Sequence, residues 1–137
     1  MIRQATQDDL DHVASLGLDF HAASPHSVDP VDMDGWRAFA AQLIDHGGVF
    51  VSEGGMIGGF LAPLYFNPAI RYAYEAFWWS PDRKGRELMS AFRQWAKEAG
   101  ARGIQWTALH NDFLPRVDAI YRRAGAVPTE VAYRERF

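Results

Sequence analysis

Apolar side chains along this 137-residue chain recur every three or four positions in four separate stretches. Thr6 is placed to cap the first of these stretches and Asp34 the second. The third covers residues 85–99 and has its apolar residues on one face and its charged residues mainly on the other. Asn111 or Asp112 can cap the fourth. The spacing therefore predicts four amphipathic helices.

The segments between these stretches have the shorter period, or the continuous apolar run, that is typical of strands. They are residues 2–5, 49–53, 56–61, 70–79, 103–109 and 127–137, the last broken or unbroken near Pro128. The glycine pair between residues 53 and 56 predicts an antiparallel hairpin. The strand–helix–strand run over residues 70–109 predicts a parallel crossover. The order β-α-α-β-β-β-α-β-α-β indicates an α/β fold with a mixed sheet and helices on both faces, in a single domain of residues 1–137.

Composition narrows the classes of function. The chain is 48% hydrophobic and 23% charged, which is ordinary for a soluble globular protein. A formal net charge of -3 argues against a general attraction to nucleic acid or to anionic membranes. No cysteine is present, so thiolate catalysis is excluded, and the five histidines lack metal-ligand spacing, so we expect no metal site. With no signal peptide and no membrane-spanning run, we expect a cytoplasmic protein.

A cluster of cations marks the start of the third helix. Arg83, Lys84 and Arg86 surround Gly85, directly after a predicted strand. A helix N-terminus presents free N–H groups and the positive end of the helix dipole, so this segment can bind a phosphate group. The other interpretation is a solvated, basic helix start with no ligand.

Several stretches, in this order and spacing, resemble the GNAT family of N-acetyltransferases. They are residues 2–10, the hairpin of residues 49–61, the strand, loop and helix start of residues 74–89, residues 95–101, and Asn111 together with residues 121–125. The family's loop usually reads Arg/Gln-x-x-Gly-x-Gly/Ala. Here the loop is shorter and keeps only Gly85, so it offers fewer amides to a pyrophosphate.

The resemblance implies acetyl-CoA as co-substrate and a set of residues that hold it. The backbone of the fourth strand would bond to the pantetheine arm, the loop to the pyrophosphate, and an asparagine to the arm. In this chain the corresponding residues are Phe77, Trp78, Trp79, Arg83, Lys84, Gly85, Arg86, Glu87 and Asn111. An ordinary buried aromatic strand and an N-cap at Asn111 remain the alternatives.

Glu75 is the candidate general base that would remove a proton from an incoming ammonium group. It lies in an otherwise apolar strand, where a carboxylate is costly to bury and where its pKa would rise. Strand alternation puts it on the face of Phe77 and Trp79. The alternative is an ion pair with Arg71 or Arg3.

Tyr121 resembles the family's tyrosine that points at the sulfur of CoA, and it is the candidate acid that protonates the leaving thiolate. A phenol with a pKa of about 10 is still protonated at neutral pH. The alternative is a tyrosine that closes the apolar face of the last helix.

Together these observations predict an acyl-CoA-dependent N-acyltransferase that moves an acetyl group from acetyl-CoA directly to a primary amine, in a small molecule or a peptide. An acidic loop with Asp29, Asp32 and Asp34 could attract a cationic acceptor, although the pattern favours a solvated acidic loop with no such role. The alternative function is a catalytically inactive GNAT-shaped module that holds acyl-CoA or a protein. The aromatic tail at residues 133–137 also suggests a homodimer that pairs through an edge strand.

Overall fold

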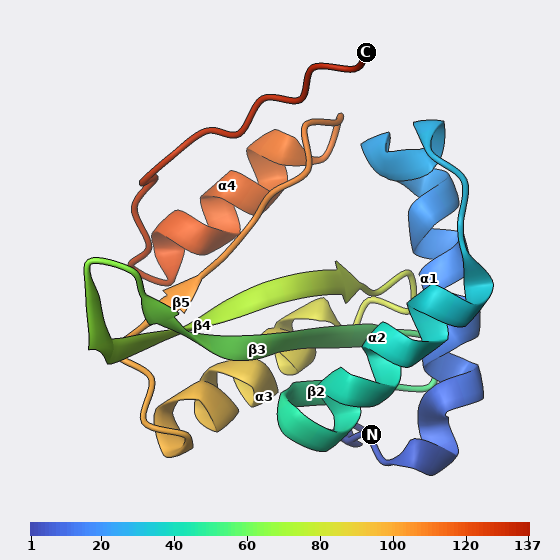
Figure 1. The fold of residues 1–137 in the computed structure, drawn as a ribbon, viewed down its shortest axis with the longest axis horizontal. Coiled ribbons are helices and arrows are strands. Elements are labelled where there is room, and N and C mark those ends of the chain that lie inside the picture. The colour runs from blue at the N-terminus through green and yellow to red at the C-terminus, as the bar shows by residue number, and fades with distance from the viewer. The chain divides into compact units, whose positions relative to one another are not determined.

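The computed structural model describes residues 1–137 and contains five strands and four α-helices (Figure 1). In chain order these are β1 (Arg3–Gln4), α1 (Leu10–Ala23), α2 (Met33–His46), β2 (Gly48–Val51), β3 (Met56–Leu64), β4 (Asn67–Trp79), α3 (Gly85–Glu98), β5 (Ile104–Gln105) and α4 (Leu114–Arg123), with short 3₁₀ helices at Gln7–Asp9 and Pro25–Val28. The chain divides into two compact units, Met1–Thr107 and Ala108–Phe137. The first unit holds the whole sheet and the first three α-helices. No helix is long and apolar enough to span a membrane.

The sheet is mixed, as the sequence predicts. Its strand order is β1-β2-β3-β4-β5, and the first three pairings are antiparallel. The last pairing, between β4 and β5, is parallel and is connected through α3. The predicted hairpin, the parallel crossover and the α/β class are therefore confirmed.

The predicted final strand was wrong. Residues 124–137 contain neither helix nor strand, and Tyr133 and Phe137 are fully exposed. The prediction rested on the local pattern of apolar residues, but a strand is stabilised by the neighbours it packs and pairs with. The predicted strand over residues 103–109 is likewise reduced to Ile104–Gln105.

Two core clusters cover the two faces of the sheet. One joins residues of α1 and α2 to the sheet, among them Val13, Leu43 and Phe77. The other joins α3 to the opposite face through Ile57, Leu88, Phe92 and neighbours. Trp79 packs against the first cluster and Trp78 against the second, so these adjacent residues face opposite sides as predicted. Figure 1 shows α3 on one side of the β3–β4 pair.

A bulge interrupts the pairing of β3 with β4. Phe77 pairs with Gly58 and Glu75 pairs with Gly59, so Ala76 is left over between them. Ala73 and Phe77, which unbroken alternation would put on one face, belong to the two opposite core clusters. The prediction that Glu75 shares a face with Phe77 assumed unbroken alternation and does not hold across this bulge.

Gly59 is required by close approach of the two strands. A Cβ at this position would lie 2.0 Å from the carbonyl oxygen of Tyr74 and 2.7 Å from the ring of Phe92. At Gly85, by contrast, the nearest atoms would be those of Trp78 and Ser80 at 3.4 to 3.7 Å, which is ordinary contact. The two glycines therefore differ in what they do for folding.

Gly59→Ala is expected to lower the free energy of unfolding by about 3 kcal/mol, at the upper end of overpacking effects, because a backbone carbonyl cannot rotate away. Gly85→Ala should be neutral or should stabilise the helix by about 0.5–1 kcal/mol. Urea denaturation of both variants measures the difference. Equal effects of the two substitutions would contradict the strand geometry described here.

Candidate functional site

The ladder between β4 and β5 is short. It consists of the pairs Ala73 with Ile104 and Tyr74 with Gln105. β4 itself continues along β3 as far as the pair of Trp79 with Met56. β5 therefore pairs with β4 only near the middle of β4, and no ladder with β5 continues along residues 75–79.

Glu75 is the first residue of β4 beyond this ladder, and its side chain is buried, with 7% of the residue exposed. Its carboxylate Oε1 accepts a hydrogen bond from the hydroxyl of Thr107 at 3.1 Å and from the Thr107 amide at 3.4 Å. Thr107 follows β5 in the chain, so the Glu75 side chain connects the two strands where their backbone ladder has ended.

The two arginines considered as ion-pair partners for Glu75 bind elsewhere. Arg3 forms a bidentate ion pair with Asp9, with N–O distances of 2.6 and 2.7 Å. Arg71 donates to the carbonyl oxygen of Ala99 at 3.3 Å. The predicted alternative role of Glu75, as the partner of either arginine, is therefore not realised.

The N-terminus of α3 is uncapped. The hydrogen bond from the Leu88 amide to the Lys84 carbonyl is the first of the helix, and no side chain caps it. The amides of residues 85–87 precede that bond and point out of the first turn. Arg83, Lys84 and Arg86 are exposed and form no ion pair. The predicted anion-binding features are thus gathered at one helix end, together with the acidic Glu87 in the same turn.

Arg83 has a left-handed backbone with φ of 63°, the one non-glycine residue of the chain with positive φ. This conformation costs a non-glycine residue roughly 1–2 kcal/mol. It persists because the residues on either side are fixed: Arg83 N donates to Ser80 O at 3.2 Å, and Lys84 N donates to Ser80 Oγ at 2.9 Å. The loop of residues 80–84 is therefore a tight, well-defined turn.

Asp82 is a central residue of this loop that sequence reasoning missed. Its Oδ2 accepts from Ser52 Oγ at 2.6 Å and from the Gly54 amide at 3.0 Å. Its Oδ1 accepts from Ser80 Oγ at 2.6 Å and more distantly from the Lys84 amide at 3.4 Å. Burial raises the pKa of this carboxyl, but the hydrogen bonds outweigh burial and lower the pKa to about 2. An isolated Asp after a proline gives no sign of such long-range partners in the sequence.

Asn111 and Tyr121 lie in the second unit. The Oδ1 of Asn111 accepts from the Phe113 amide at 3.0 Å, and its carbonyl accepts from the Leu114 amide at 3.0 Å, so Asn111 shapes the turn that leads into α4. Phe113 rather than Asn111 occupies the N-cap position. Tyr121 is the buried residue of α4, with 9% exposed.

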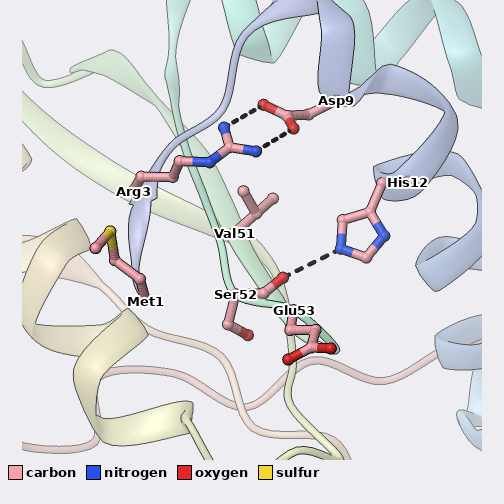
Figure 2. A pocket seen from close by; sticks show the side chains of 7 residues that line it. All are labelled: Met1, Arg3, Asp9, His12, Val51, Ser52 and Glu53. Carbon is pink, nitrogen blue, oxygen red and sulfur yellow. Dashed lines mark hydrogen bonds and ion pairs between the residues drawn. The ribbon is translucent and has the colours of Figure 1, made fainter.

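A cavity of about 330 Å³ opens near the N-terminus of the chain (Figure 2). The residues that line it are Met1, Arg3, Asp9, His12, Val51, Ser52 and Glu53. His12 Nε2 lies 3.1 Å from the carbonyl oxygen of Ser52, whose hydroxyl points away from His12 (Figure 2). None of the predicted site residues lines this cavity. The link to the loop before α3 runs through the Ser52 hydroxyl, which donates to Asp82.

The ionised Asp9 should make the fold sensitive to acid. The hydrogen bonds from Arg3, opposed by burial, lower the pKa of Asp9 to about 2 from 3.8. A carboxyl with a lowered folded-state pKa contributes stability above its unfolded pKa, and this contribution is lost as the pH falls from about 4 to about 2. Asp9→Asn should therefore be less stable than the wild type at pH 7, and the gap should narrow below pH 4. Urea denaturation at pH 7, 4 and 3 measures it, and a gap that does not change with pH would contradict the ion pair.

Comparison with solved structures identifies this arrangement. A putative acetyltransferase from Agrobacterium tumefaciens superposes with a TM-score of 0.67 at 22% identity, over 100% of this chain and 99% of that chain. An aminoglycoside acetyltransferase from an uncultured soil metagenomic sample, in complex with sisomicin, gives 0.70 at 18% identity, over 100% and 95%. An aminoglycoside N-acetyltransferase in complex with CoA gives 0.66 at 18% identity, over 100% and 95%. The chain has the GNAT fold. No protein-family model and no curated protein sequence matches it.

The resemblance noted in the sequence is confirmed at the level of structure. At identities below 25% the likeness establishes the fold. The segment from Glu75 to Glu87 runs from the end of the short β4–β5 ladder to the uncapped start of α3.

Proposed function

We propose that this protein is an N-acetyltransferase that moves the acetyl group of acetyl-CoA directly to a primary amine. The observation that carries the proposal is the early end of the β4–β5 ladder, at Tyr74 and Gln105, within a GNAT fold. An extended arm with amide groups can lie along a strand where its neighbour has stopped pairing, as an added strand does. The pantetheine arm of CoA has this character, and the backbone of residues 77–79 is the part of β4 that would hold it.

The loop and helix start after β4 suit the pyrophosphate of CoA. The amides of Gly85, Arg86 and Glu87 supply donors, the helix dipole favours negative charge, and three unpaired cations stand at the same end. The loop keeps these features although it is short. Asn111 of the second unit would add a contact to the arm.

The chemistry we propose needs no covalent enzyme intermediate. Glu75 takes a proton from the acceptor ammonium, directly or through water, and the amine nitrogen then attacks the thioester carbonyl. The carbon–sulfur bond breaks as the amide forms, and the Tyr121 hydroxyl protonates the departing thiolate. The second proton that the nitrogen loses restores the Tyr121 hydroxyl through solvent, and Glu75 releases the first proton to solvent. The products are the N-acetylated amine and CoA, with one net proton released to solvent.

The acceptor we propose is a small-molecule or peptide amine. One solved neighbour is bound to the aminoglycoside sisomicin, and another is a ribosomal-protein-alanine N-acetyltransferase from Brucella melitensis, so the fold carries both kinds of acceptor. In this chain Asp29 and Asp32 are exposed between α1 and α2, and Asp34 is exposed in the first turn of α2, so these carboxylates would favour a cationic acceptor. The net charge of -3 is compatible with that choice.

The test is release of the CoA thiol from acetyl-CoA in the presence of a panel of primary amines that includes aminoglycosides, polyamines, amino acids and peptides. Thiol release that depends on one class of amine, with the N-acetylated product identified by mass spectrometry, supports the proposal. Tyr121→Phe should slow that release while acetyl-CoA still binds. Acetyl-CoA binding without transfer to any amine would count against the transfer reaction.

A further inference from the structure

We infer that Asp82 is a positioning residue for the proposed acetyl-CoA site, because its carboxylate ties the loop before α3 to the turn between β2 and β3. The inference rests on the proposed function, since it concerns how the pyrophosphate-binding end of α3 is held. Asp82 itself would not touch the cofactor. It would fix the backbone that does.

The two oxygens of Asp82 serve two different segments. Oδ2 faces the β2–β3 turn and binds Ser52 Oγ and the Gly54 amide, at 2.6 and 3.0 Å. Oδ1 faces its own loop and binds Ser80 Oγ at 2.6 Å. Only a carboxylate has acceptors on both sides. An asparagine of the same shape has one oxygen, and its NH₂ group would meet donors on the other side.

The turn is shaped to receive this carboxylate. A Cβ at Gly55 would lie 2.8 Å from Ser52 Oγ and 2.9 Å from Asp82 Oδ1. A Cβ at Gly54 would lie 3.1 Å from the Cβ of Asp82. The absence of a side chain at both glycines thus allows the turn to approach the loop closely. This close approach explains the presence of two consecutive glycines better than the conformation of the turn alone.

The network stops one residue short of the helix. Ser80 Oγ, which donates to Asp82, accepts the amide of Lys84 at 2.9 Å, and the Asp82 carboxylate lies 3.4 Å from that same amide. An Asp or Ser at the N-cap usually accepts the amides of the first helical turn. Here the side chains of Ser80 and Asp82 both accept from the amide of Lys84 instead. They fix the start of the helix and leave the amides of residues 85–87 for an anion.

Asp9 provides a matched control. It is also an ionised carboxylate held by several donors, Arg3 and the Thr6 amide, and its pKa is also lowered to about 2. It acts on the turn between β1 and α1 and has no contact with the loop before α3. Loss of stability alone should therefore affect both variants, whereas loss of cofactor binding should affect only one.

The experiment compares the full-length wild type, Asp82→Asn and Asp9→Asn, with acetyl-CoA as the probe. Calorimetry gives the dissociation constants, and backbone amide resonances of residues 84–87 report the local geometry. Asp82→Asn should bind acetyl-CoA at least tenfold more weakly and should shift the amides of residues 84–87 in the free protein. Asp9→Asn should bind within twofold of the wild type and leave these resonances in place.

Ser80→Ala is the second variant if Asp82→Asn does not fold. It removes only the hydroxyl that links Asp82 to the Lys84 amide, and it should weaken binding at least threefold. If Asp82→Asn and Ser80→Ala both bound acetyl-CoA within twofold of the wild-type affinity, the inference would be overturned. The proposed function would be unaffected by that result. Equal weakening by Asp9→Asn would also overturn the inference. A wild type that binds no acetyl-CoA would overturn the proposed function itself, and the inference with it.

Discussion

Replacement of Arg83, Lys84 and Arg86 together by alanine is expected to weaken acetyl-CoA binding by about 100-fold or more. Charge-assisted hydrogen bonds to phosphate are among the stronger polar contacts, and two such contacts suffice for an effect of this size. None of the three cations forms an ion pair within the chain, so their loss should leave folding nearly unchanged. Calorimetry with acetyl-CoA measures the affinity, and circular dichroism checks the fold.

The control removes three cations from elsewhere on the same unit. Arg93, Lys97 and Arg102 lie on α3 or just after it, away from its N-terminus, and also form no ion pair. Their combined replacement by alanine changes the net charge equally. At 0.15 M salt it should alter the affinity by less than about threefold, because exposed charges beyond the Debye length of ~8 Å are screened. Equal weakening by both triple variants would show a general charge effect and contradict a local pyrophosphate site.

Glu75→Gln is expected to lower the rate of acetyl transfer by about 100-fold or more and to leave acetyl-CoA affinity nearly unchanged. General-base catalysis contributes about 10²–10⁴-fold, and glutamine cannot take a proton from an ammonium group. Glutamine has the shape of glutamate and keeps an oxygen that can accept from the Thr107 hydroxyl. Steady-state rates at saturating acetyl-CoA, with an acceptor from the amine panel, measure the loss.

Thr107→Val distinguishes the proposed role of Glu75 as a base from its role as a hydrogen-bond acceptor. This variant keeps the carboxylate of Glu75 and removes the hydroxyl that donates to it at 3.1 Å. The rate should fall by less than about tenfold. If Glu75→Gln retained the wild-type rate, Glu75 would be only a structural acceptor for Thr107, and another group would have to be the base.

The helices and the hairpin could be predicted from the sequence because local signals agree there with the final packing. In α3, for example, Leu88, Met89, Phe92 and Ala96 recur at helical spacing and are the residues buried in the structure. Local signals also agree with the packing in the strands on either side of α3, so the parallel crossover could be predicted as well. These elements make up most of the fold.

Features that depend on two segments of the chain could not be predicted. The bulge at Ala76 follows from the fit of Gly58 and Gly59 against β4, and it changes the face of every residue beyond it. The four-way network of Asp82 depends on Ser52 and Gly54, about thirty residues away in the sequence. The apolar run to Leu109 looked like a long strand, but the length of β5 is set by its pairing with β4, which ends at Gln105.

The candidate site was predicted in its chemistry but only in part in its geometry. The loop residues 83–87 are gathered at one helix end as expected, because they are neighbours in the chain. Glu75 is buried as expected and accepts from Thr107, whereas Arg3 and Arg71 bind elsewhere. Asn111 and Tyr121 keep their predicted roles as proposals.

The most direct test of the central claim is a titration of the isotope-labelled wild type with acetyl-CoA, followed by the backbone amide resonances. We expect saturable shifts with a micromolar dissociation constant, concentrated at residues 77–79 and 85–87. The absence of shifts at millimolar acetyl-CoA would contradict the proposed site. So would shifts confined to the cavity around Arg3 and His12.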